Sequence, residues 1–141
     1  DNHSRLVGSE MCIRDSGKGD IDLAADTFRV ILVTSSYTAD KDAHTRRDDI
    51  TNEVTGTGYT AGGTACTVTV VVNTSLDRTT YTFSSVNWPT STITARGCVV
   101  VKWRGGASSA DELIFYNDFG SNITTSATTF TVAQSVITVQ N

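Results

Sequence analysis

The sequence predicts an all-β fold: an antiparallel β-sandwich of seven or eight strands, of which the jelly roll is one form. Between residues 66 and 139 the chain reads as short runs of Thr, Val, Ile and aromatic residues with a period of two, and polar turns separate the runs. Such alternation places one side of each strand in a core and the other in water. With 141 residues the chain has room for one domain with a single core, which we assign to residues 17–141.

Residues 1–16 do not follow this pattern. They hold the only Met and one of the three Cys of the chain, and they show no strand period. The run LVGSEMCIRDS, from Leu6 to Ser16, resembles the translated read-through of a sequencing adaptor, a string that recurs at the ends of metagenomic assemblies. We therefore interpret residues 1–16 as an artefactual leader, disordered or loosely attached, with the native start upstream of Gly17. A natural N-terminal arm is the alternative.

The first expected strand is 27–34, and we place it in the centre of a sheet because both of its faces are apolar. Residues 21–25, which precede it, fit a short helical turn. Residues 35–63, which follow it, form a polar connection that is unusually long for a compact domain. This connection is expected to hold a short helix near residues 46–52 or to be a surface loop that makes contacts.

Two strands follow. In the first, 66–72, Cys66 shares a face with three valines. The second, 79–83, is followed by a slip of one residue in the apolar phase. A β-bulge at Ser84-Ser85 would cause this slip, because one extra residue reverses the face of all residues after it. Pro89 is expected to end the run, since it has no N–H to donate to a ladder.

The last four expected strands are 92–104, 111–119, 128–132 and 136–139. In the longest of them, alternation directs Val99, Val101 and Trp103 inward and directs Lys102 and Arg104 to the opposite face. The inward set also includes Ile93 and Ala95, and the outward set also includes Arg96.

The charge balance and the hydropathy pattern exclude two classes of partner. The net charge is −4 and the pI is about 4.9, whereas phosphate binding needs a basic surface, so we expect no nucleic-acid partner. No apolar run approaches the roughly 20 residues of a membrane-spanning helix, so we expect no membrane partner.

No set of residues points to catalysis, to a cofactor or to a metal. His44 is the only His outside the leader, and we interpret it as a solvated loop residue because a triad or a zinc site needs further partners. The acidic pairs near residues 20 and 40 lack the remaining ligands of a calcium loop. Adjacent carboxylates such as Asp111-Glu112 point apart in a strand, so they cannot flank a glycosidic bond. We therefore predict no enzyme activity and assign no catalytic, cofactor-binding or metal residue.

Cys66 and Cys98 could close a disulfide loop, but the strand phases argue against it. Cys66 lies on a valine face, whereas Cys98 shares its face with Arg96 and Lys102. We expect Cys66 to be a small core residue and Cys98 to be a free or half-covered thiol. Unpaired cysteines suit assembly in a reducing cytoplasm.

Two further patterns have structural interpretations. The glycine-rich run 56–63 superficially resembles a phosphate-binding loop, but it has the wrong spacing and no following helix, so its glycines are expected to permit turns. Trp88, Trp103, Tyr59 and Tyr116 could form a sugar-stacking platform. The inward phases of both tryptophans favour core packing instead.

The segment NEVTGTGYTAGG at 52–63 is similar to one in small, Thr-rich structural proteins of tailed bacteriophages, which are frequent in marine and metagenomic phage genomes. DTFRVIL at 26–32 resembles their opening strand, and VNWPTSTITAR at 86–96 resembles a middle segment. YNDFG at 116–120, followed by TFTV at 129–132, resembles their ending. The likeness runs in order from Ile21 to Val139 and departs from the family pattern at Gly97–Gly106.

This resemblance implies a non-enzymatic virion component, either a capsid decoration or head protein or a tail-associated one, that acts through contacts with phage capsid or tail proteins. We expect a homo-oligomer, with a trimer favoured, located in the virion after assembly in the host bacterial cytoplasm. A sheet edge and the 35–63 connection are the expected contact elements. The alternative is a carbohydrate-binding β-sandwich module, free or on a phage fibre, which needs exposed Trp or Tyr side chains on one face.

Overall fold

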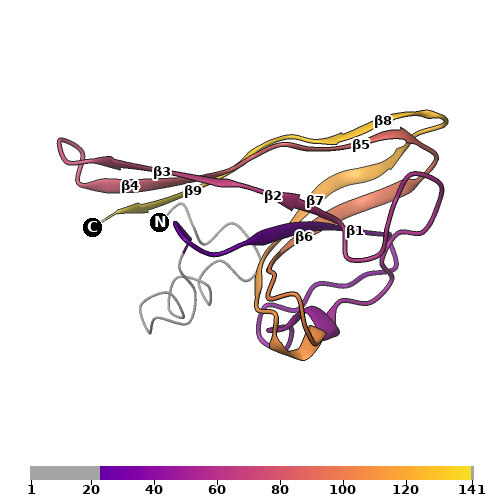
Figure 1. Cartoon of the computed structure of the whole chain (residues 1–141), viewed down its shortest axis with the longest axis horizontal. Coiled ribbons are helices and arrows are strands. Elements are labelled where there is room, and N and C mark those ends of the chain that lie inside the picture. Colours follow the sequence, from indigo (N-terminus) through magenta and orange to yellow (C-terminus); the bar gives the residue numbers. More distant parts are fainter. Residues whose placement is uncertain (1–22, 141) are drawn as a thin grey trace.

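The computed structural model describes residues 23–140, which form an all-β, sandwich-like fold of antiparallel strands, shown in Figure 1. Over this range the strands are β1 (Phe28–Val33), β2 (Thr64–Cys66), β3 (Val68–Asn73), β4 (Arg78–Phe83), β5 (Val86–Ser91), β6 (Thr94–Lys102), β7 (Leu113–Thr124), β8 (Thr128–Val132) and β9 (Ser135–Gln140). Two short 3-10 helices are η2 (Arg47–Asp49) and η3 (Ser108–Ala110). The strands pair in the orders β2-β1-β6-β7, β3-β4-β9 and β5-β8. The predicted leader and the first part of the predicted turn at 21–25 lie outside the described residues.

The four-stranded sheet is buried on both of its faces. β1 lies between β2 and β6, which confirms the predicted central position. Val30 and Leu32 point into the main core, and Ile31 and Val33 point into a second cluster on the opposite face. Strands covered on both sides read as continuous apolar runs, which is the pattern of FRVILV in β1 and of Val99 and its neighbours in β6.

The main core fills the space between the four-stranded sheet and the long strands that cross it. Phe83 of β4 lies at its centre, edge-to-face with Phe28 of β1 at 5.6 Å and with Phe115 of β7 at 5.2 Å between ring centroids. Aromatic rings favour this geometry and bury large apolar areas. The three rings therefore join the two layers of the sandwich.

The long connection after β1 covers the second face of the four-stranded sheet. Tyr37 is buried there against Val99 and Leu113, and Ile50 packs on the same cluster. The segment is anchored by backbone bonds to the end of β1, including Val54 N–H to the Leu32 carbonyl at 2.9 Å. The short helix expected near residues 46–52 is present as η2. The connection is thus a cover for its own sheet as well as a surface loop.

The phase slip after Phe83 has a cause other than the predicted bulge. Phe83 lies opposite Ser135 and Val86 lies opposite Val132, so the same number of residues separates the pairs on both strands. The bulge predicted at Ser84-Ser85 is therefore wrong. In Figure 1, β4 runs on into β5 and β8 runs on into β9, so that the four strands form one long ribbon. β4 and β9 belong to one sheet and β5 and β8 to another, so both strands of the ribbon pass between sheets at the same position. Along both strands, the side chains that face the core shift by one position at this break.

Pro89 does not end its strand, contrary to expectation. It lies inside β5, next to Thr90, which has a φ of +51°. The register of β5 with β8 shifts between Trp88 and Ser91 at this point. β5 has a ladder partner on one side only, and a proline is tolerated where no ladder bond is required of it.

Three other expected strands differ from the observed ones. The strand expected at 111–119 is longer and runs from Leu113 to Thr124 as β7. The strand expected at 66–72 divides at Thr67 into β2 and β3, which belong to different sheets. In β6 the register with β7 shifts between Ala95 and Gly97, so Ala95 faces the main core whereas Val99 and Val101 face the second cluster. The single inward face predicted for residues 92–104 is therefore wrong, because both faces of β6 are buried.

Gly63 lies where the connection at residues 35–63, which covers the sheet, comes close to β1. Its φ is +69°, and a Cβ added there would lie 1.8 Å from the carbonyl oxygen of Val30. We predict that Gly63→Ala lowers the free energy of unfolding by clearly more than the roughly 1–2 kcal/mol of a left-handed alanine, because overpacking adds about 1–3 kcal/mol. Chemical denaturation measures the change.

The matched control is Gly105→Ala. Gly105 has a similar φ of +79°, but an added Cβ would meet nothing within 4 Å. Gly105→Ala should therefore show the conformational cost alone. Equal losses of stability in the two variants would contradict the close approach of Gly63 to β1.

Candidate functional site

His44 is half-buried beside Tyr37 rather than solvated as expected. The rings lie 5.6 Å apart, and the Tyr37 hydroxyl is 3.0 Å from Nδ1 of His44. The backbone N–H of Asp40 donates to the same Nδ1 at 3.3 Å, so this nitrogen is an acceptor and the hydroxyl donates to it. Burial raises the pKa of Tyr37 to about 12, which keeps the hydroxyl protonated. His44 therefore serves as an acceptor that holds the loop together.

The adjacent carboxylates Asp111 and Glu112 bind different arginines. Asp111 is fully buried, and its Oδ2 accepts a bond from Arg47 Nε at 2.6 Å. Glu112 Oε1 accepts from Arg104 Nη2 at 2.6 Å and from Arg46 Nη1 at 2.8 Å. We call these five residues the arginine–carboxylate cluster. The cluster holds the part of the 35–63 connection around η2 against the connection between β6 and β7. Every charge in the cluster therefore has a structural role.

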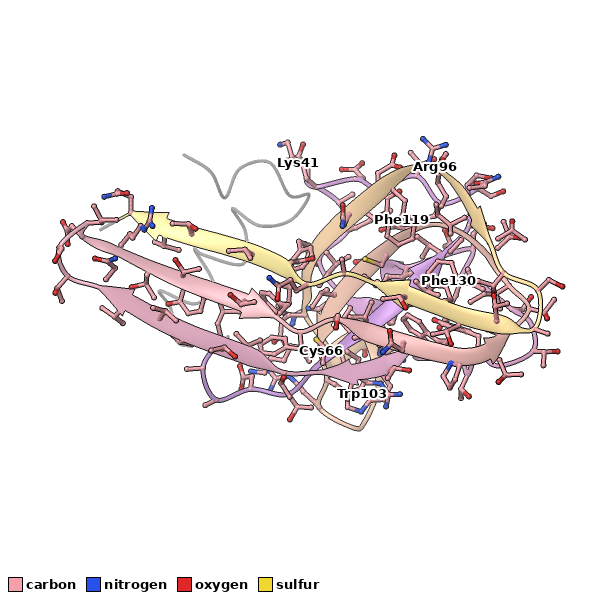
Figure 2. All side chains as sticks on the ribbon, turned by 90° about the horizontal axis from the view of Figure 1, so that it is seen from above. Lys41, Cys66, Arg96, Trp103, Phe119 and Phe130 are labelled. Carbon is pink, nitrogen blue, oxygen red and sulfur yellow. The ribbon has the colours of Figure 1, made fainter. Side chains whose placement is uncertain are left out.

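Trp103 lies at the edge of this cluster. The guanidinium carbons of Arg29 and Arg47 are each 4.4 Å from its ring centroid, an arrangement that stabilises a cation over an aromatic ring. Core packing is confirmed for Trp88, which is 3 % exposed, but Trp103 is half-buried at the rim of the second cluster. Figure 2 shows Trp103 at the margin of the molecule.

The aromatic residues suggested as a sugar platform do not share a face. Tyr59 packs against Trp88 with ring centroids 5.8 Å apart, and Tyr116 packs against Tyr37 at 5.5 Å. None of the aromatic side chains in residues 23–140 is exposed.

The glycine-rich run 56–63 forms turns, as expected, and the Tyr59 hydroxyl and the Gly62 amide have partners within the chain. Tyr59 donates its hydroxyl proton to Glu53 Oε1 at 2.7 Å and accepts the Leu32 N–H at 3.0 Å. The Gly62 N–H donates to the same Glu53 oxygen at 2.7 Å. Burial raises the pKa of Tyr59, so it stays protonated. The Gly62 amide is therefore not presented to a phosphate group.

Both described cysteines are free and buried. Cys66 and Cys98 belong to the main core, so the expectation that they point to opposite sides is wrong. Cys98 is also fully covered rather than half-covered, because the face it shares with Lys102 is buried. Burial raises the pKa of Cys66 to about 11 and that of Cys98 to about 12. Neutral, inaccessible thiols are poor nucleophiles.

A groove of about 290 Å³ lies between β7 and β8. Figure 2 shows Phe119 and Phe130 side by side at this place, and their ring centroids are 6.2 Å apart. Asn117, Thr131 and Gln134 are its polar residues, and no charged side chain lines it. The groove is at the lower limit of small-molecule pockets, which measure roughly 300–1,000 Å³. Its lining has no group that could transfer a proton.

The three-stranded sheet extends beyond the four-stranded one, toward the β3–β4 turn at the left of Figure 1. Its inner face carries Val70, Tyr81 and Ile137 in register, and Ile137 belongs to the main core. Farther out the sheet leaves the core. There Val71 and Val72 of β3 are 54 % and 63 % exposed.

β3 forms an open edge of this sheet. Thr67 accepts the Ser84 N–H at 2.8 Å, so its backbone faces β4 and β5. Because backbone groups alternate along an antiparallel strand, Val68, Val70 and Val72 turn their N–H and C=O groups outward. No strand within residues 23–140 pairs with that side of β3.

Sequence reasoning expected a sheet edge to make contacts, but it did not identify β3 as that edge. An edge is defined by strand order, which one sequence does not reveal. The available signal was local: three consecutive valines interrupt the period of two, and the run VTVVVN contains no charge and no proline.

No group of three or more His, Cys, Asp and Glu side chains in residues 23–140 is arranged to hold a metal ion. No helix in that range is both long enough and apolar enough to cross a membrane.

Comparisons of the chain with protein-family models, with curated proteins and with solved structures found no match. The proposals below therefore depend on the fold, the surfaces described above and the resemblance in the sequence.

Glu112 makes the fold sensitive to acid. Burial alone would raise its pKa, but hydrogen bonds from Arg104 and Arg46 outweigh burial and hold the pKa below the ordinary value of 4.5. A pKa lowered by folding means that the stabilisation is present above pH 4.5 and is lost as the pH falls through the folded-state pKa. We predict that wild type and Glu112→Gln differ less in unfolding free energy as the pH falls below that value.

Asp118→Asn is the control for this series. The Asp118 carboxylate pairs with Arg96 at 2.8 Å on the surface, where ion pairs contribute little because water screens them. The difference in unfolding free energy between Asp118→Asn and wild type should stay small at every pH. A Glu112→Gln difference that does not change between neutral and acidic pH would contradict the proposed linkage.

Proposed function

We propose that this chain is a non-enzymatic structural protein of a tailed-bacteriophage particle, present in many copies and held in place by protein–protein contacts. The observation that carries the proposal is the open, uncharged edge of β3 with exposed Val71 and Val72. Unpaired strand edges accept other strands readily, and soluble proteins usually protect them with charge or proline. An edge left unprotected fits a protein whose surface meets other chains.

The phage assignment is supported by the resemblance to small, Thr-rich phage structural proteins over residues 21–139. On this basis the partners are capsid or tail proteins and further copies of the chain. The protein would assemble in the host bacterial cytoplasm and reside in the virion, on the head or with the tail.

The non-enzymatic part of the proposal is supported by how the reactive groups are used. The buried carboxylates neutralise arginines, His44 accepts a bond from its own loop, and both described thiols are buried. Active sites usually bring such groups together in a cleft, with at least one of them free to react. Here each group stabilises the fold.

The carbohydrate-binding alternative has less support. Sugar platforms need aromatic rings open to solvent, whereas Trp88 lies in the main core and Trp103 is covered by two guanidinium groups. The groove between β7 and β8 contains two aromatic rings, but Phe130 is almost fully buried.

Mass spectrometry of purified particles tests the proposal. The particles are prepared from a host that carries the gene and are purified on density gradients. We predict that peptides of this chain remain with the particles, at a constant ratio to the major capsid protein. A ratio in the hundreds of copies per particle indicates a head position and a handful indicates a tail position. A replication protein of the same phage is the control for carry-over. If purification removes this chain to the same extent as the replication protein, the result contradicts the proposal.

A further inference from the structure

We infer that β3 is a self-association edge: it pairs antiparallel with β3 of a second copy of this chain, and the two three-stranded sheets become one continuous six-stranded sheet. This deepens the proposed function and rests on it in taking the partner to be another copy. The inference depends on three features of β3, namely its outward backbone groups, its side chains and the contrast with the other sheet edges.

The outward backbone groups form a set that matches itself. They belong to Val68, Val70 and Val72, as derived from the bond between Ser84 and Thr67. With a twofold axis at Val70, this residue lies opposite Val70 of the other copy, and Val68 lies opposite Val72. Each of these pairs can exchange two N–H···O=C bonds. All the outward groups of the strand then have partners.

The side chains permit this pairing. A twofold axis perpendicular to the sheet keeps the inner faces of both copies on the same side, so Val72, which is 63 % exposed, meets Val68 of the other copy. On the outer face, Val71 meets Thr69. β3 contains no charged residue, so no like charges are brought together. Pairs of β-branched residues across strands are favourable.

Three of the other edges of the described sheets are interrupted. β7 contains Asp118 and Gly120, which has a φ of +85°. β5 contains Pro89 and a register shift, and β2 is only three residues long. Charge, proline, irregular backbone and short length all discourage pairing between chains. β3, by contrast, keeps an unbroken register with β4 along its whole length.

β8 and β9 are the remaining edges. The exposed residues of β8 are all threonines, and its Phe130 and Val132 are buried. β9 differs from β3 in two ways. Its exposed valine, Val136, is 48 % exposed, whereas β3 exposes two adjacent valines more fully. The last residue of β9, Gln140, uses its side chain to bind the carbonyl groups of Leu76 and Asp77 in the β3–β4 turn. β3 therefore offers the larger apolar edge, and β9 provides the matched control.

A second copy is the occupant that the strand itself favours. The edge offers no charged group by which it could select a different partner. An uncharged, valine-rich edge left open would join further strands without limit, which is the path to aggregation. Pairing about a twofold axis consumes the edge and closes the assembly. We therefore expect a dimer as the basic unit rather than the trimer favoured by the sequence.

Sedimentation-velocity measurements on the full chain test the inference. The wild type should sediment as a dimer at micromolar concentration, and Val71→Lys should weaken self-association at least tenfold, because lysine on an edge strand opposes pairing. Val136→Lys is the matched control, since it places the same charge on the same outer face at the opposite edge. It should leave the dimer unchanged. Circular dichroism checks that both variants stay folded.

A second pair of variants acts on the backbone. Val70→Pro removes an outward N–H of β3, and Thr138→Pro removes one of β9, in each case without breaking a bond to β4. Val70→Pro should dissociate the dimer and Thr138→Pro should not. If Val70→Pro does not fold, the lysine pair still decides the question.

Three results would overturn the inference: a wild type that stays monomeric at about 100 µM, a dimer or trimer that survives Val71→Lys, or dissociation caused by the β9 variants instead. These results are independent of the particle experiment. A monomer that is nevertheless found in particles would refute the β3 pairing and leave the proposed function standing. A β3-dependent dimer that is absent from particles would do the reverse.

Discussion

The four-stranded sheet has two apolar faces, and the rest of the structure follows from the need to cover both. Val30 and Leu32 of β1 point one way and Ile31 and Val33 point the other, with β6 repeating the pattern. Leaving either face in water would expose several large side chains, each worth about 1.5–3 kcal/mol when buried. The long ribbon formed by β4–β5 and β8–β9 covers one face. Because no second sheet is present in the described chain to cover the other, the connection after β1 does so.

A cover made of irregular chain needs additional bonds to hold it, because it has no ladder of its own. Ordering a loop costs about 1–2 kcal/mol per residue in backbone entropy. The arginine–carboxylate cluster supplies part of what offsets this cost, with the fully buried Asp111 bound to Arg47 and to the Arg104 N–H. Buried charges are stable only when paired and hydrogen-bonded. These paired charges therefore hold the connection after β1 against the second cluster.

How far the sequence predicts this fold can be traced to particular strands. β8 was predicted with its observed bounds, because alternation between a core and water leaves a clear period of two in TTFTV. β6 was assigned one buried face because nothing in its own residues reveals that the cover lies on the other side. The slip after Phe83 was visible, but whether it is a bulge or a change of sheet depends on the partner strand, which has a matching break at Ala133-Gln134. The open edge of β3 was missed for the same reason: face and edge are properties of strand order and of the neighbouring layer.

The position of β3 also explains why its valines are exposed at all. The ribbon is longer than the body it covers, so its inner half packs on Phe28 and Phe115 through Phe83, and its outer half extends past the core. There the sheet retains strand-forming residues on both faces, but none of residues 23–140 forms a layer beneath it. A three-stranded sheet without a packed face is marginal in water. Pairing through β3 would double the number of strands in the part of the sheet that the core does not support. The stability of the outer ribbon would then depend on association with a second copy of the chain.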